Sequence, residues 1–455
     1  MPTNPSPITL PLLALVGLGA LACDDELDTR SDAAELRAAP SGSSTGGYNL
    51  QLSTKLRFHA PQPEASVARG RATFGVAANL VDEDPSEALF EGFSAVAGRE
   101  IVSNGRTCFT CHRGSEHGFG LPAPPLSASV DLGDTLFTGI EADAGGDPDA
   151  FTNLDQHGLF KYRVNRFDPR LPLDAPIRQV HGWRKSPRLH NLALQAGFLT
   201  DLRGRLLQDA ARGAFQSHTQ DADDRFDDLL PPAAADDVEA FLFTLVTDPL
   251  LAALRDPSDP LYAALLADPY YTVPITTAAQ ERGRKVFDQF CYASCHNMPN
   301  VFSSLDNVEP LGNGERPPEA PSWAAAVGRA YNIGVSERNL HGLRFTRFVG
   351  PGQFEPIVLQ LANEDGSIED HEVEFDLGLA LTSGRTADIG RFKVPQLREL
   401  ADNAPYFHDN SAATIPEVVD YFLSDAYANS ADGQDHPIRL SAQQRADLIE
   451  FLAIL

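Results

Sequence analysis

Cysteine, methionine and tryptophan are scarce in this sequence of 455 residues. The chain contains five cysteines, two methionines and two tryptophans. Five cysteines are too few for the network of disulfides that stabilises small secreted domains, and a chain about three times the length of a ~150-residue domain buries enough apolar surface without one. The positions of the cysteines therefore carry more information than their number.

Positive charge is also scarce. Lysines and arginines total 36, against 63 aspartates and glutamates, so the formal net charge is −27. Such a surface repels the phosphates of nucleic acids and of anionic membranes, and it attracts basic proteins. Nucleic-acid binding is therefore excluded as a function, and a basic protein is the expected kind of partner.

Long apolar runs are missing, with one exception at the N-terminus. Residues 1–22 carry no charge and include an apolar run over residues 8–22, which is followed by Cys23 and three acidic residues. About 15 apolar residues are too few to span a bilayer, but they suit the core of a signal peptide. We predict a signal peptide over residues 1–22 and an exported protein of the periplasm or cell envelope.

The residues around Cys23 resemble a bacterial lipobox, in which the cysteine receives a lipid. This resemblance predicts lipidation of Cys23, which would be the chain's sole attachment to a membrane. Residues 23–55 are acidic and then rich in glycine and serine, which predicts a flexible tether. Two alternatives stay open: an exported protein without a lipid, and an intracellular chain with a buried apolar N-terminus.

The remainder of the chain repeats itself, and its Pro-containing segment recurs at an interval of 208 residues, as Pro187 and Pro395 show. Three landmarks occur twice in the same order: a short expected helix before each cysteine pair (98–102 and 283–287), a Pro-containing segment (186–201 and 394–409) and an amphipathic helix (237–242 and 447–452). Landmarks that recur in order indicate homologous domains. We place an N-terminal domain at 56–272 and a C-terminal domain at 273–455.

The expected fold is mainly α, with long loops and little β structure. An apolar fraction of 42% and a charged fraction of 22% are ordinary for globular proteins. Ser441 precedes a polar first turn and Pro416 marks another helix start. Between the cysteine-rich segment and Phe392, alternation over residues 358–375 predicts one small β-hairpin at most.

Each predicted domain contains a pair of cysteines followed directly by a histidine. Cys108, Cys111 and His112 form the Cys-x-x-Cys-His sequence of covalent c-type haem attachment. In such sites the thiols add to the vinyl groups of the haem, and the adjacent histidine becomes the proximal ligand of the iron. The motif therefore predicts that His112 is an iron ligand.

The second motif is a variant of the first. Three residues separate Cys291 from Cys295, and His296 follows. For the first motif, a zinc site of Cys108, Cys111, His112 and His117 is an alternative, and buried thiols or a disulfide are others. Adjacent cysteine and histidine residues suit one tetrahedral zinc shell poorly, and the recurrence of the motif favours haem. We predict two covalently bound haem c groups in two tandem cytochrome-c-like domains, with His296 as the second proximal ligand.

Three stretches of the C-terminal half carry a family resemblance: residues 388–395, 404–409 and 417–421. They are similar to the C-terminal domain of the bacterial di-haem cytochrome c peroxidase family, which includes MauG. The resemblance covers about residues 85–455. It implies that the haems meet near the domain interface, that the N-terminal haem reacts with hydrogen peroxide or another small oxidant, and that the C-terminal haem receives electrons from a small donor cytochrome or cupredoxin. It also implies that His408 is the characteristic histidine of the C-terminal domain.

The chain departs from the family at the distal side of the C-terminal haem. Phe422 stands where the family has a methionine or tyrosine ligand, and Tyr421 is its neighbour. Met298 is too close to His296 to reach the opposite face of the haem. Tyr421 is therefore either a distal ligand or a core residue. If it is a core residue, the sixth position of the iron is filled by another side chain or by none.

The N-terminal haem pocket departs as well. Peroxide cleavage needs a group that moves a proton between the two oxygens. The alignment puts Ala210 at a family glutamine and Gln220 at a family glutamate. Gln220 cannot transfer protons as a carboxylate does, whereas His218 can. We therefore name His218 and Gln220 as the candidate distal residues, with an exposed His218 as the alternative.

Other family positions also differ. Thr200 replaces an aromatic residue between the haems, so Trp183 and Trp323 are candidates for an electron relay or are core residues. Lys185 replaces an asparagine that helps to bind calcium, which argues against that ion. Ala128 replaces a removable distal histidine, with His117 as the nearest imidazole, so we expect the first haem to be open without prior reduction.

Three functions fit these observations. The first is a cytochrome-c-peroxidase-like oxidoreductase that reduces hydrogen peroxide with electrons from a basic donor. The second is a di-haem oxygenase or cofactor-modifying enzyme, as in the rubber-oxygenase and MauG branches. The third is an electron carrier or sensor without turnover of its own.

Overall fold

The computed structural model describes residues 34–36, 56–58, 61–75, 101–103, 106–137, 141–143, 150–163, 180–195, 197–204, 207–217, 219–221, 230, 232–304, 330–350 and 353–455. Within these ranges no helix is long and apolar enough to cross a membrane. The predictions for the signal peptide and for Cys23 lie outside the described residues.

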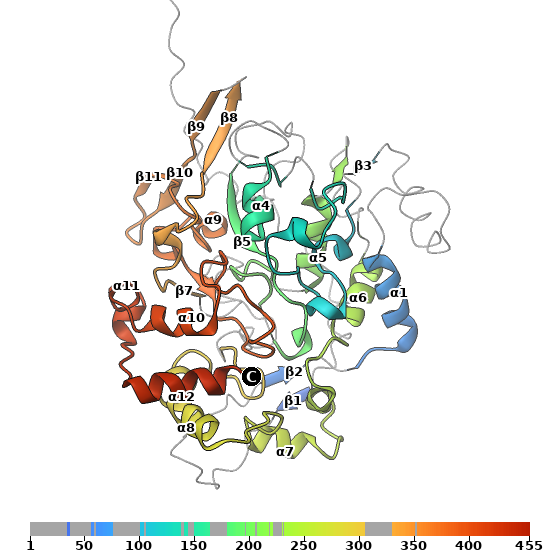
Figure 1. Ribbon diagram of the computed structural model, residues 1–455. Coiled ribbons are helices and arrows are strands. Elements are labelled where there is room, and N and C mark those ends of the chain that lie inside the picture. The colour runs from blue at the N-terminus through green and yellow to red at the C-terminus, as the bar shows by residue number, and fades with distance from the viewer. Residues whose placement is uncertain are drawn as a thin grey trace, which may run out of the picture.

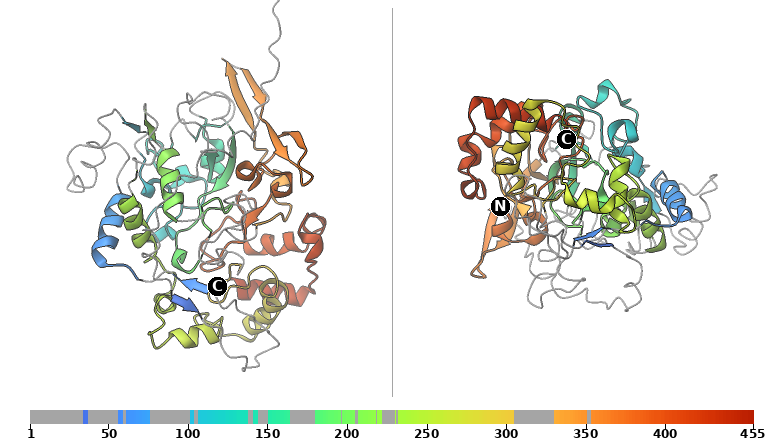
Figure 2. Two further views of the ribbon diagram at one scale, coloured as in Figure 1. Left: turned by 180° about the vertical axis from the view of Figure 1, so that it is seen from behind. Right: turned by 90° about the horizontal axis from the view of Figure 1, so that it is seen from below.

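Two pairs of packed helices mark the two halves of the molecule (Figure 1). Helix α1 (Glu64–Phe74) packs against α6 (Pro232–Leu242), and α8 (Ala278–Phe287) packs against α12 (Ala442–Leu452). Figure 2 shows from two further directions that the pairs lie on different sides of the molecule. Each pair joins segments that are far apart in the sequence, so in each half the first helix packs against a much later one.

A glycine allows the two helices of each pair to approach closely. A Cβ atom at Gly70 would lie 1.7 Å from the carbonyl oxygen of Asp237, and one at Gly283 would lie 1.9 Å from that of Asp447. Each of these aspartates also accepts hydrogen bonds from both ends of the guanidinium of the arginine that precedes the glycine. The two helix pairs are therefore built in the same way.

The helix expected over residues 98–102 is wrong for the described residues 101 and 102. They lie in strand β3 (Ile101–Ser103), which pairs with β6 (Thr219–Asp221). The counterpart of α8 is α1, since residues 69–74 read Arg-Gly-Arg-Ala-Thr-Phe and residues 282–287 read Arg-Gly-Arg-Lys-Val-Phe. This match can be read from the sequence. The prediction chose residues 98–102 instead, because they also contain a Gly-Arg pair and lie closer to the cysteines.

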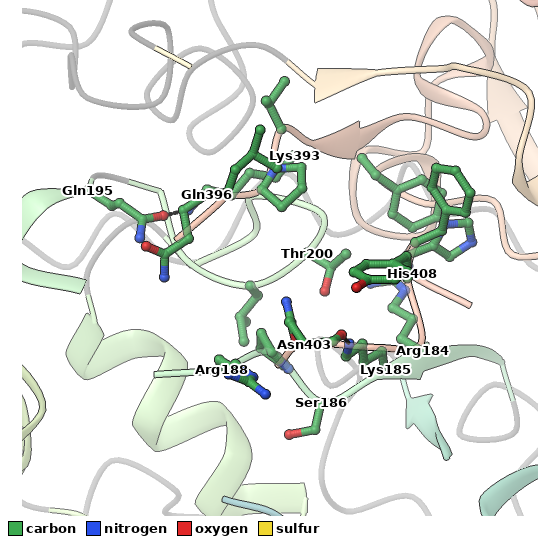
Figure 3. Close-up of a pocket in the computed structure, with 18 of the residues that line it drawn as sticks. Arg184, Lys185, Ser186, Arg188, Gln195, Thr200, Lys393, Gln396, Asn403 and His408 are labelled. Carbon is green, nitrogen blue, oxygen red and sulfur yellow. Dashed lines mark hydrogen bonds between the residues drawn. The ribbon is translucent and has the colours of Figure 1, made fainter. Parts of the chain in front are cut away.

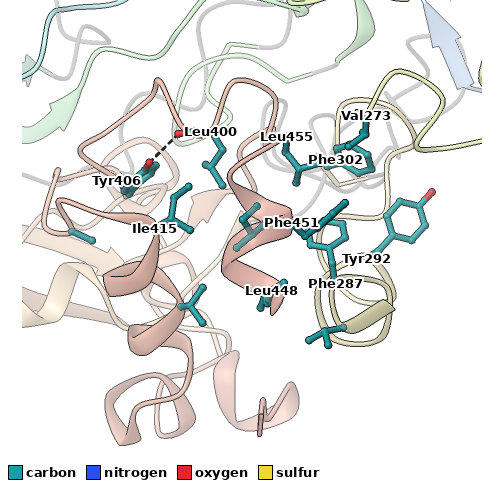
Figure 4. Packing of buried hydrophobic residues seen from close by; sticks show 14 residues of the cluster. Val273, Phe287, Tyr292, Phe302, Leu400, Tyr406, Ile415, Leu448, Phe451 and Leu455 are labelled. Atoms are coloured by element: carbon teal, nitrogen blue, oxygen red, sulfur yellow. Dashed lines mark hydrogen bonds between the residues drawn. The ribbon is translucent and has the colours of Figure 1, made fainter. Parts of the chain in front are cut away.

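The C-terminal half has its own apolar core (Figure 4). Phe287 of α8 and Phe451 of α12 are wholly buried, and their rings are in contact at 5.3 Å between centroids. Ile415, the first residue of α10 (Ile415–Phe422), and Tyr406 join the same cluster. Burial of each large apolar side chain stabilises the fold by roughly 1.5–3 kcal/mol.

The Pro-containing segments of the two halves share unusual backbone conformations. Residues at corresponding positions have positive φ angles, and they are 208 residues apart: Asn191 and Glu399, Leu199 and Phe407, and Leu202 and Asn410. Isolated β-bridges also correspond, between Phe198 and Gly204 and between Tyr406 and Ala412. Positive φ angles are uncommon outside glycine, so this agreement reflects a shared fold of the two segments.

The strands are short and form two-stranded sheets. The β10–β11 hairpin (Val358–Ala362 and Ile368–Glu372) is the hairpin that the alternation predicted. The other pairs are β1 (Ala34–Leu36) with β2 (Leu56–Phe58), β4 (Leu159–Arg163) with β5 (His181–Lys185), β7 (Ala330–Tyr331) with β12 (Phe392–Lys393), and β8 (Thr346–Gly350) with β9 (Gln353–Pro356). The limit of one hairpin before Phe392 is wrong, because the β8 and β9 strands form a second one, which the alternation does not mark. Short helices complete the described part: α3 (Cys108–Cys111), α4 (Thr152–His157), α5 (Leu207–Ser217), α7 (Tyr262–Ala267), α9 (Ala380–Ser383) and α11 (Asp425–Ala428).

The prediction of a mainly α fold with little β structure is confirmed for the described residues. The helix starts at Thr414–Pro416 and Ser441 are also confirmed, and both have a capping box. The flexible tether predicted over 23–55 is wrong for residues 34–36. They form β1, because a polar composition does not prevent backbone groups from pairing with a second strand.

Gly70→Ala is expected to destabilise the N-terminal half. The new Cβ would overlap a backbone carbonyl of α6, which cannot move independently of its helix, so we expect a loss of about 1–3 kcal/mol in the free energy of unfolding. Gly75→Ala, just after the same helix, is the control, because its Cβ would meet the nearest atoms at an ordinary 3.5 Å. Urea unfolding followed by far-UV circular dichroism measures both variants. Equal stability of the two would contradict the close helix contact.

Candidate functional site

The two cysteine motifs line one cavity between the halves of the molecule. The cavity has a volume of about 1060 Å³, at the top of the range of roughly 300–1,000 Å³ typical of small-molecule sites. Its lining includes all six motif residues: Cys108, Cys111, His112, Cys291, Cys295 and His296. The fold thus brings together two motifs that are more than 180 residues apart in the sequence.

Helix α3 presents the first motif. Thr107 begins the helix, and its backbone nitrogen donates to the side chain of Thr110. The backbone nitrogen of His112 donates to the carbonyl oxygen of Cys108 at 2.9 Å. One helical turn therefore carries both cysteines and directs the histidine away from them.

The second motif accommodates its extra residue in a wider turn. Residues Asp288–Tyr292 form a π-helical turn, in which hydrogen bonds span five residues instead of four. The backbone nitrogen of His296 consequently donates to the carbonyl oxygen of Cys291 at 2.9 Å, as in the first motif. The π-turn explains how three intervening residues preserve the relation between the first cysteine and the histidine.

Both motif histidines are oriented by a backbone carbonyl. Nδ1 of His112 lies 3.0 Å from the carbonyl oxygen of Phe119, and Nδ1 of His296 lies 2.8 Å from that of Phe302. A carbonyl oxygen can only accept, so Nδ1 donates and Nε2 keeps its lone pair. Both phenylalanines have a φ of +53°. The two loops therefore hold their histidines in the same tautomer.

Burial keeps these imidazoles neutral and these thiols protonated. Loss of solvation lowers the pKa of both His112 and His296 to about 4. It raises the pKa of Cys108 and of Cys291 to about 12. A neutral imidazole with a free Nε2 is the form that ligates iron, and donation from the other ring nitrogen to a carbonyl is the usual support of such a ligand. The residues therefore fit a haem with a histidine ligand in each half.

The zinc alternative finds no support in the described part of the chain. There, no group of three or more histidine, cysteine, aspartate or glutamate side chains is arranged to hold a metal ion. His117 does not belong to the described residues that line the cavity.

Helices α5 and α10 form matching apolar walls of the cavity. Their lining residues correspond at the same interval of 208: Ala210 with Val418, Ala211 with Val419, Ala214 with Phe422, and Phe215 with Leu423. Helix α5 packs in the same cluster as Cys108. No titratable side chain of these two helices lines the cavity among the described residues. Both walls can exclude water, and neither supplies a described proton-transfer group.

Tyr421 is not among the residues that line the cavity. It is buried in a cluster with Val335 and Tyr427, and its hydroxyl donates to the carbonyl oxygen of Ile333. Burial raises the pKa of its phenol to about 12. Phe422, the next residue, lines the cavity in its place. This arrangement favours the core-packing alternative for Tyr421 over the distal-ligand alternative.

The predicted residues of the first distal pocket are only partly described. Gln220 lies in strand β6, opposite Val102 of β3. His218 lies outside the described residues. Their roles therefore stay predictions.

His408 lies in the cavity wall and stacks on Phe392, with 3.8 Å between ring centroids and 14° between ring planes. Burial lowers the pKa of its imidazole, so the ring is neutral at pH 7. Its backbone carbonyl accepts from the nitrogen of Lys185 at 2.6 Å, which joins the two halves directly. His408 thus contributes both to the lining and to the interface.

Neither of the two tryptophans that the sequence offered in place of the aromatic residue missing at Thr200 is found in the described lining of the cavity. Trp183 is wholly buried in a separate apolar cluster and does not line the cavity, and Trp323 lies outside the described residues. Tyr162 of β4 lines the cavity instead, with the guanidinium of Arg203 3.6 Å from its ring centroid. No motif marks Tyr162, because only the pairing of β4 with β5 brings it there.

Four charged side chains form a buried network beside the cavity. Arg184 donates to Asp376 at 2.7 and 2.8 Å and to Asp201 at 2.8 Å, and Arg203 donates to Asp201 at 2.7 Å. Burial alone would raise the pKa of Asp201, but the guanidinium groups of Arg203 and Arg184 lower it to about 2. The network joins β5 of the N-terminal half to the segment before α9 of the C-terminal half.

The chain is similar in sequence to curated cytochrome-c peroxidases, although no protein-family model matches it. IdrP1 of Pseudomonas sp. (strain SCT) is 35% identical over 83 residues, which are 18% of this chain and 21% of that protein. IdrP2 of Denitromonas iodatirespirans is 26% identical over 311 residues, which are 64% of this chain and 72% of that protein. The first match thus spans about a fifth of the relative's length.

Among solved structures, a MauG-like protein associated with microbial copper homeostasis is 18% identical, with a TM-score of 0.43 over 87% of this chain and 89% of that chain. The relatives named cytochrome-c peroxidase confirm the family resemblance that the motifs predicted.

Asp376→Asn is expected to destabilise the protein strongly. The change leaves the buried guanidinium of Arg184 with one carboxylate instead of two, and loss of a buried partner costs about 3 kcal/mol. Asp420→Asn is the control, because Asp420 forms the same two-point pair with Arg445 at the exposed surface, where about 0–1 kcal/mol is expected. Equilibrium unfolding in urea measures both free energies. A larger loss in the control would show that the buried network does not stabilise the interface.

Proposed function

We propose that this chain, a relative of the cytochrome-c peroxidases, is a di-haem c-type oxidoreductase that reduces hydrogen peroxide with electrons from a donor cytochrome or cupredoxin. One observation carries the proposal: two haem-attachment motifs line a single cavity, and each presents a histidine in the ligating tautomer. The overall reaction takes two electrons and two protons, and it converts hydrogen peroxide into two molecules of water.

The chain's own residues would hold two haems. Cys108 and Cys111 would attach one haem and Cys291 and Cys295 the other, each by two thioether bonds. His112 and His296 would approach their irons with Nε2, because Nδ1 is engaged by a carbonyl. When bound, the haems supply the electron-transfer chemistry of iron. The protein fixes the orientation of each imidazole before the haem is reduced or oxidised.

Reduction of peroxide also requires protons at the first haem. The cavity walls provide apolar surface from α5, so a proton must come from outside these walls. His218 and Gln220 are the proposed distal pair, with His218 as the group that transfers the proton and Gln220 as a hydrogen-bonding residue. His408 is proposed as the residue that orders the C-terminal half of the cavity.

Electrons would arrive from a separate protein. The net charge of −27 favours a basic donor that is guided to the surface by electrostatic attraction. We place the protein in the periplasm or cell envelope, exported by the signal peptide at 1–22 and anchored by a lipid at Cys23. Such a position gives the protein access to small extracytoplasmic electron carriers.

A second function is favoured by one specific observation. The lining residues of α5 and α10 are apolar on both sides of the cavity. An apolar wall suits an organic substrate or bound oxygen better than it suits the proton transfer of peroxide cleavage. The second candidate is therefore a MauG-like or rubber-oxygenase-like di-haem enzyme that oxidises an organic group.

Two haems are expected to stay attached after denaturation. The intact mass should exceed that of the mature polypeptide by two haem groups, and the alkaline pyridine spectrum should give the same stoichiometry. Removal of one attachment site in the double variant Cys291→Ala and Cys295→Ala should leave one haem. Cys23→Ala is the control and should keep two. Haem lost on denaturation of the unaltered protein would refute covalent attachment.

Peroxide added to reduced protein is expected to oxidise both haems, and a reduced basic cytochrome c should then be consumed continuously. The rate should fall as the ionic strength rises, because salt screens attraction between unlike charges. The double variant Cys108→Ala and Cys111→Ala is the control and should lose donor oxidation. Oxygen uptake with an organic substrate, and no donor oxidation, would support the second candidate. If the protein neither oxidises the donor nor takes up oxygen, the third function, an electron carrier or sensor, would be supported.

A further inference from the structure

The lining of the cavity is strongly cationic in a chain that is strongly anionic overall. Two carboxylate residues line it, Glu141 and Glu399, among the described residues. Eight basic residues line it: Arg106, Lys161, Arg184, Lys185, Arg188, Arg203, Lys393 and Arg398. This reversal of sign against a net charge of −27 indicates a site for an anionic ligand.

Most of the arginines in this lining already have carboxylate partners. Arg106 pairs with Glu141 at 2.8 Å and Arg188 pairs with Glu399 at 3.2 Å. Arg184 and Arg203 belong to the buried network with Asp201 and Asp376. These charges are neutralised within the protein, so they do not by themselves call for a ligand.

Lys185 and Lys393 differ from these arginines. The Nζ atom of Lys185 donates to the carbonyl oxygens of Asn403 and Pro405 at 2.5 and 2.6 Å. The Nζ atom of Lys393 donates to Oε1 of Gln195 at 2.9 Å and to the carbonyl oxygen of Gly197 at 2.8 Å. All four acceptors are neutral. An ammonium has three donors, so each lysine has a third that these bonds do not use.

The two lysines are related by the repeat and cross the interface in opposite directions. Lys185 lies 208 residues before Lys393, and the acceptors on one side lie 208 residues from those on the other. Their backbone nitrogens also donate across the interface, from Lys185 to His408 and from Lys393 to Thr200. Figure 3 shows Lys185 close to Asn403, and Lys393 close to Gln195. Each half of the molecule thus inserts one ammonium into the other half.

This arrangement is costly without an anion. A buried ammonium loses its hydration. Hydrogen bonds to neutral carbonyl groups compensate for this loss only in part. Loss of solvation lowers the pKa of both lysines to about 7. A carboxylate nearby would restore the charged form and stabilise the interface. Each haem carries two carboxylate groups, so the cofactor itself can supply the missing charge.

We propose that Lys185 and Lys393 are a reciprocal pair of positioning residues that hold the two halves together and balance the carboxylates of the two haems. The proposal rests on the di-haem assignment above, and it adds that haem charge and docking of the halves are linked. It also gives Lys185 a role at the position where the family has a calcium-binding asparagine: its ammonium bonds two carbonyl oxygens of the opposite half directly.

The test removes each charge and measures the haem reduction potentials by spectroelectrochemistry. Lys185→Met and Lys393→Met keep the length of the side chain but remove its charge. A buried positive charge opposes the more positive ferric state, so each variant should shift the ferric–ferrous equilibrium of at least one haem toward ferric, on the order of tenfold. Limited proteolysis in the same variants should cut faster between the halves, because two hydrogen bonds across the interface are lost.

Three further variants make the result specific. Lys185→Arg and Lys393→Arg retain the charge and should restore the potentials. Lys285→Met removes an exposed charge of α8, whose side chain is 67% exposed, and should leave the potentials unchanged. If the methionine variants carry both haems at unaltered potentials, the proposal is wrong. It is also wrong if the arginine variants lose haem or stability as much as the methionine variants do.

These outcomes are separate from those that test the proposed function. A protein that holds two haems but does not reduce peroxide can still show the shift in potential, which would support the lysine pair and reject peroxide reduction. Continuous peroxide reduction, with potentials that do not respond to either lysine, would give the reverse conclusion.

Discussion

The site depends on one hydrogen bond made twice, from Nδ1 of a motif histidine to a backbone carbonyl of the loop that follows. His112 bonds to Phe119 and His296 to Phe302. This bond selects the tautomer and leaves Nε2 as the atom that faces the cavity. Burial keeps both rings unprotonated at neutral pH, since it lowers the pKa of each imidazole to about 4. The protein thus holds two imidazoles in the same tautomer, each next to a loop with the same uncommon backbone conformation.

Neither half forms the cavity alone. Each half has a helix pair and an apolar cluster of its own, but the wall between the motifs consists of segments from both. Backbone bonds at Lys185 and Lys393, the lysine side chains and the Arg184 network all cross this boundary. These contacts are polar and directional. They specify one relative orientation of the halves, which an apolar interface alone would fix less strictly.

The apolar walls and the cationic lining have complementary consequences for function. Ala210, Ala214, Val418 and Phe422 exclude water and offer no proton-transfer group. Lys185 and Lys393, whose hydrogen-bond acceptors are neutral, would supply positive charge for an anionic cofactor. Exclusion of water strengthens every charge interaction in the site, so the potential of a bound haem would respond to the lysines more than it would at a surface. Because water is excluded, protons for peroxide reduction need a dedicated source. The presence of such a source therefore distinguishes peroxide reduction from oxidation of an organic group.

The sequence by itself determined what depends on local spacing. The two cysteine motifs, the interval of 208 residues, the capped helices at Thr414 and Ser441 and the mainly helical fold could all be predicted, because turns, caps and helical periodicity involve residues close together in the chain. Tertiary structure alone decided what depends on distant partners. It placed residues 101 and 102 in a strand where a helix was expected, and it kept Tyr421 out of the cavity lining. It also brought Tyr162 to the cavity wall and let Lys185 and Lys393 each bond to the opposite half. Packing and long-range hydrogen bonds control these features, and they join residues whose separation in the sequence carries no local signal.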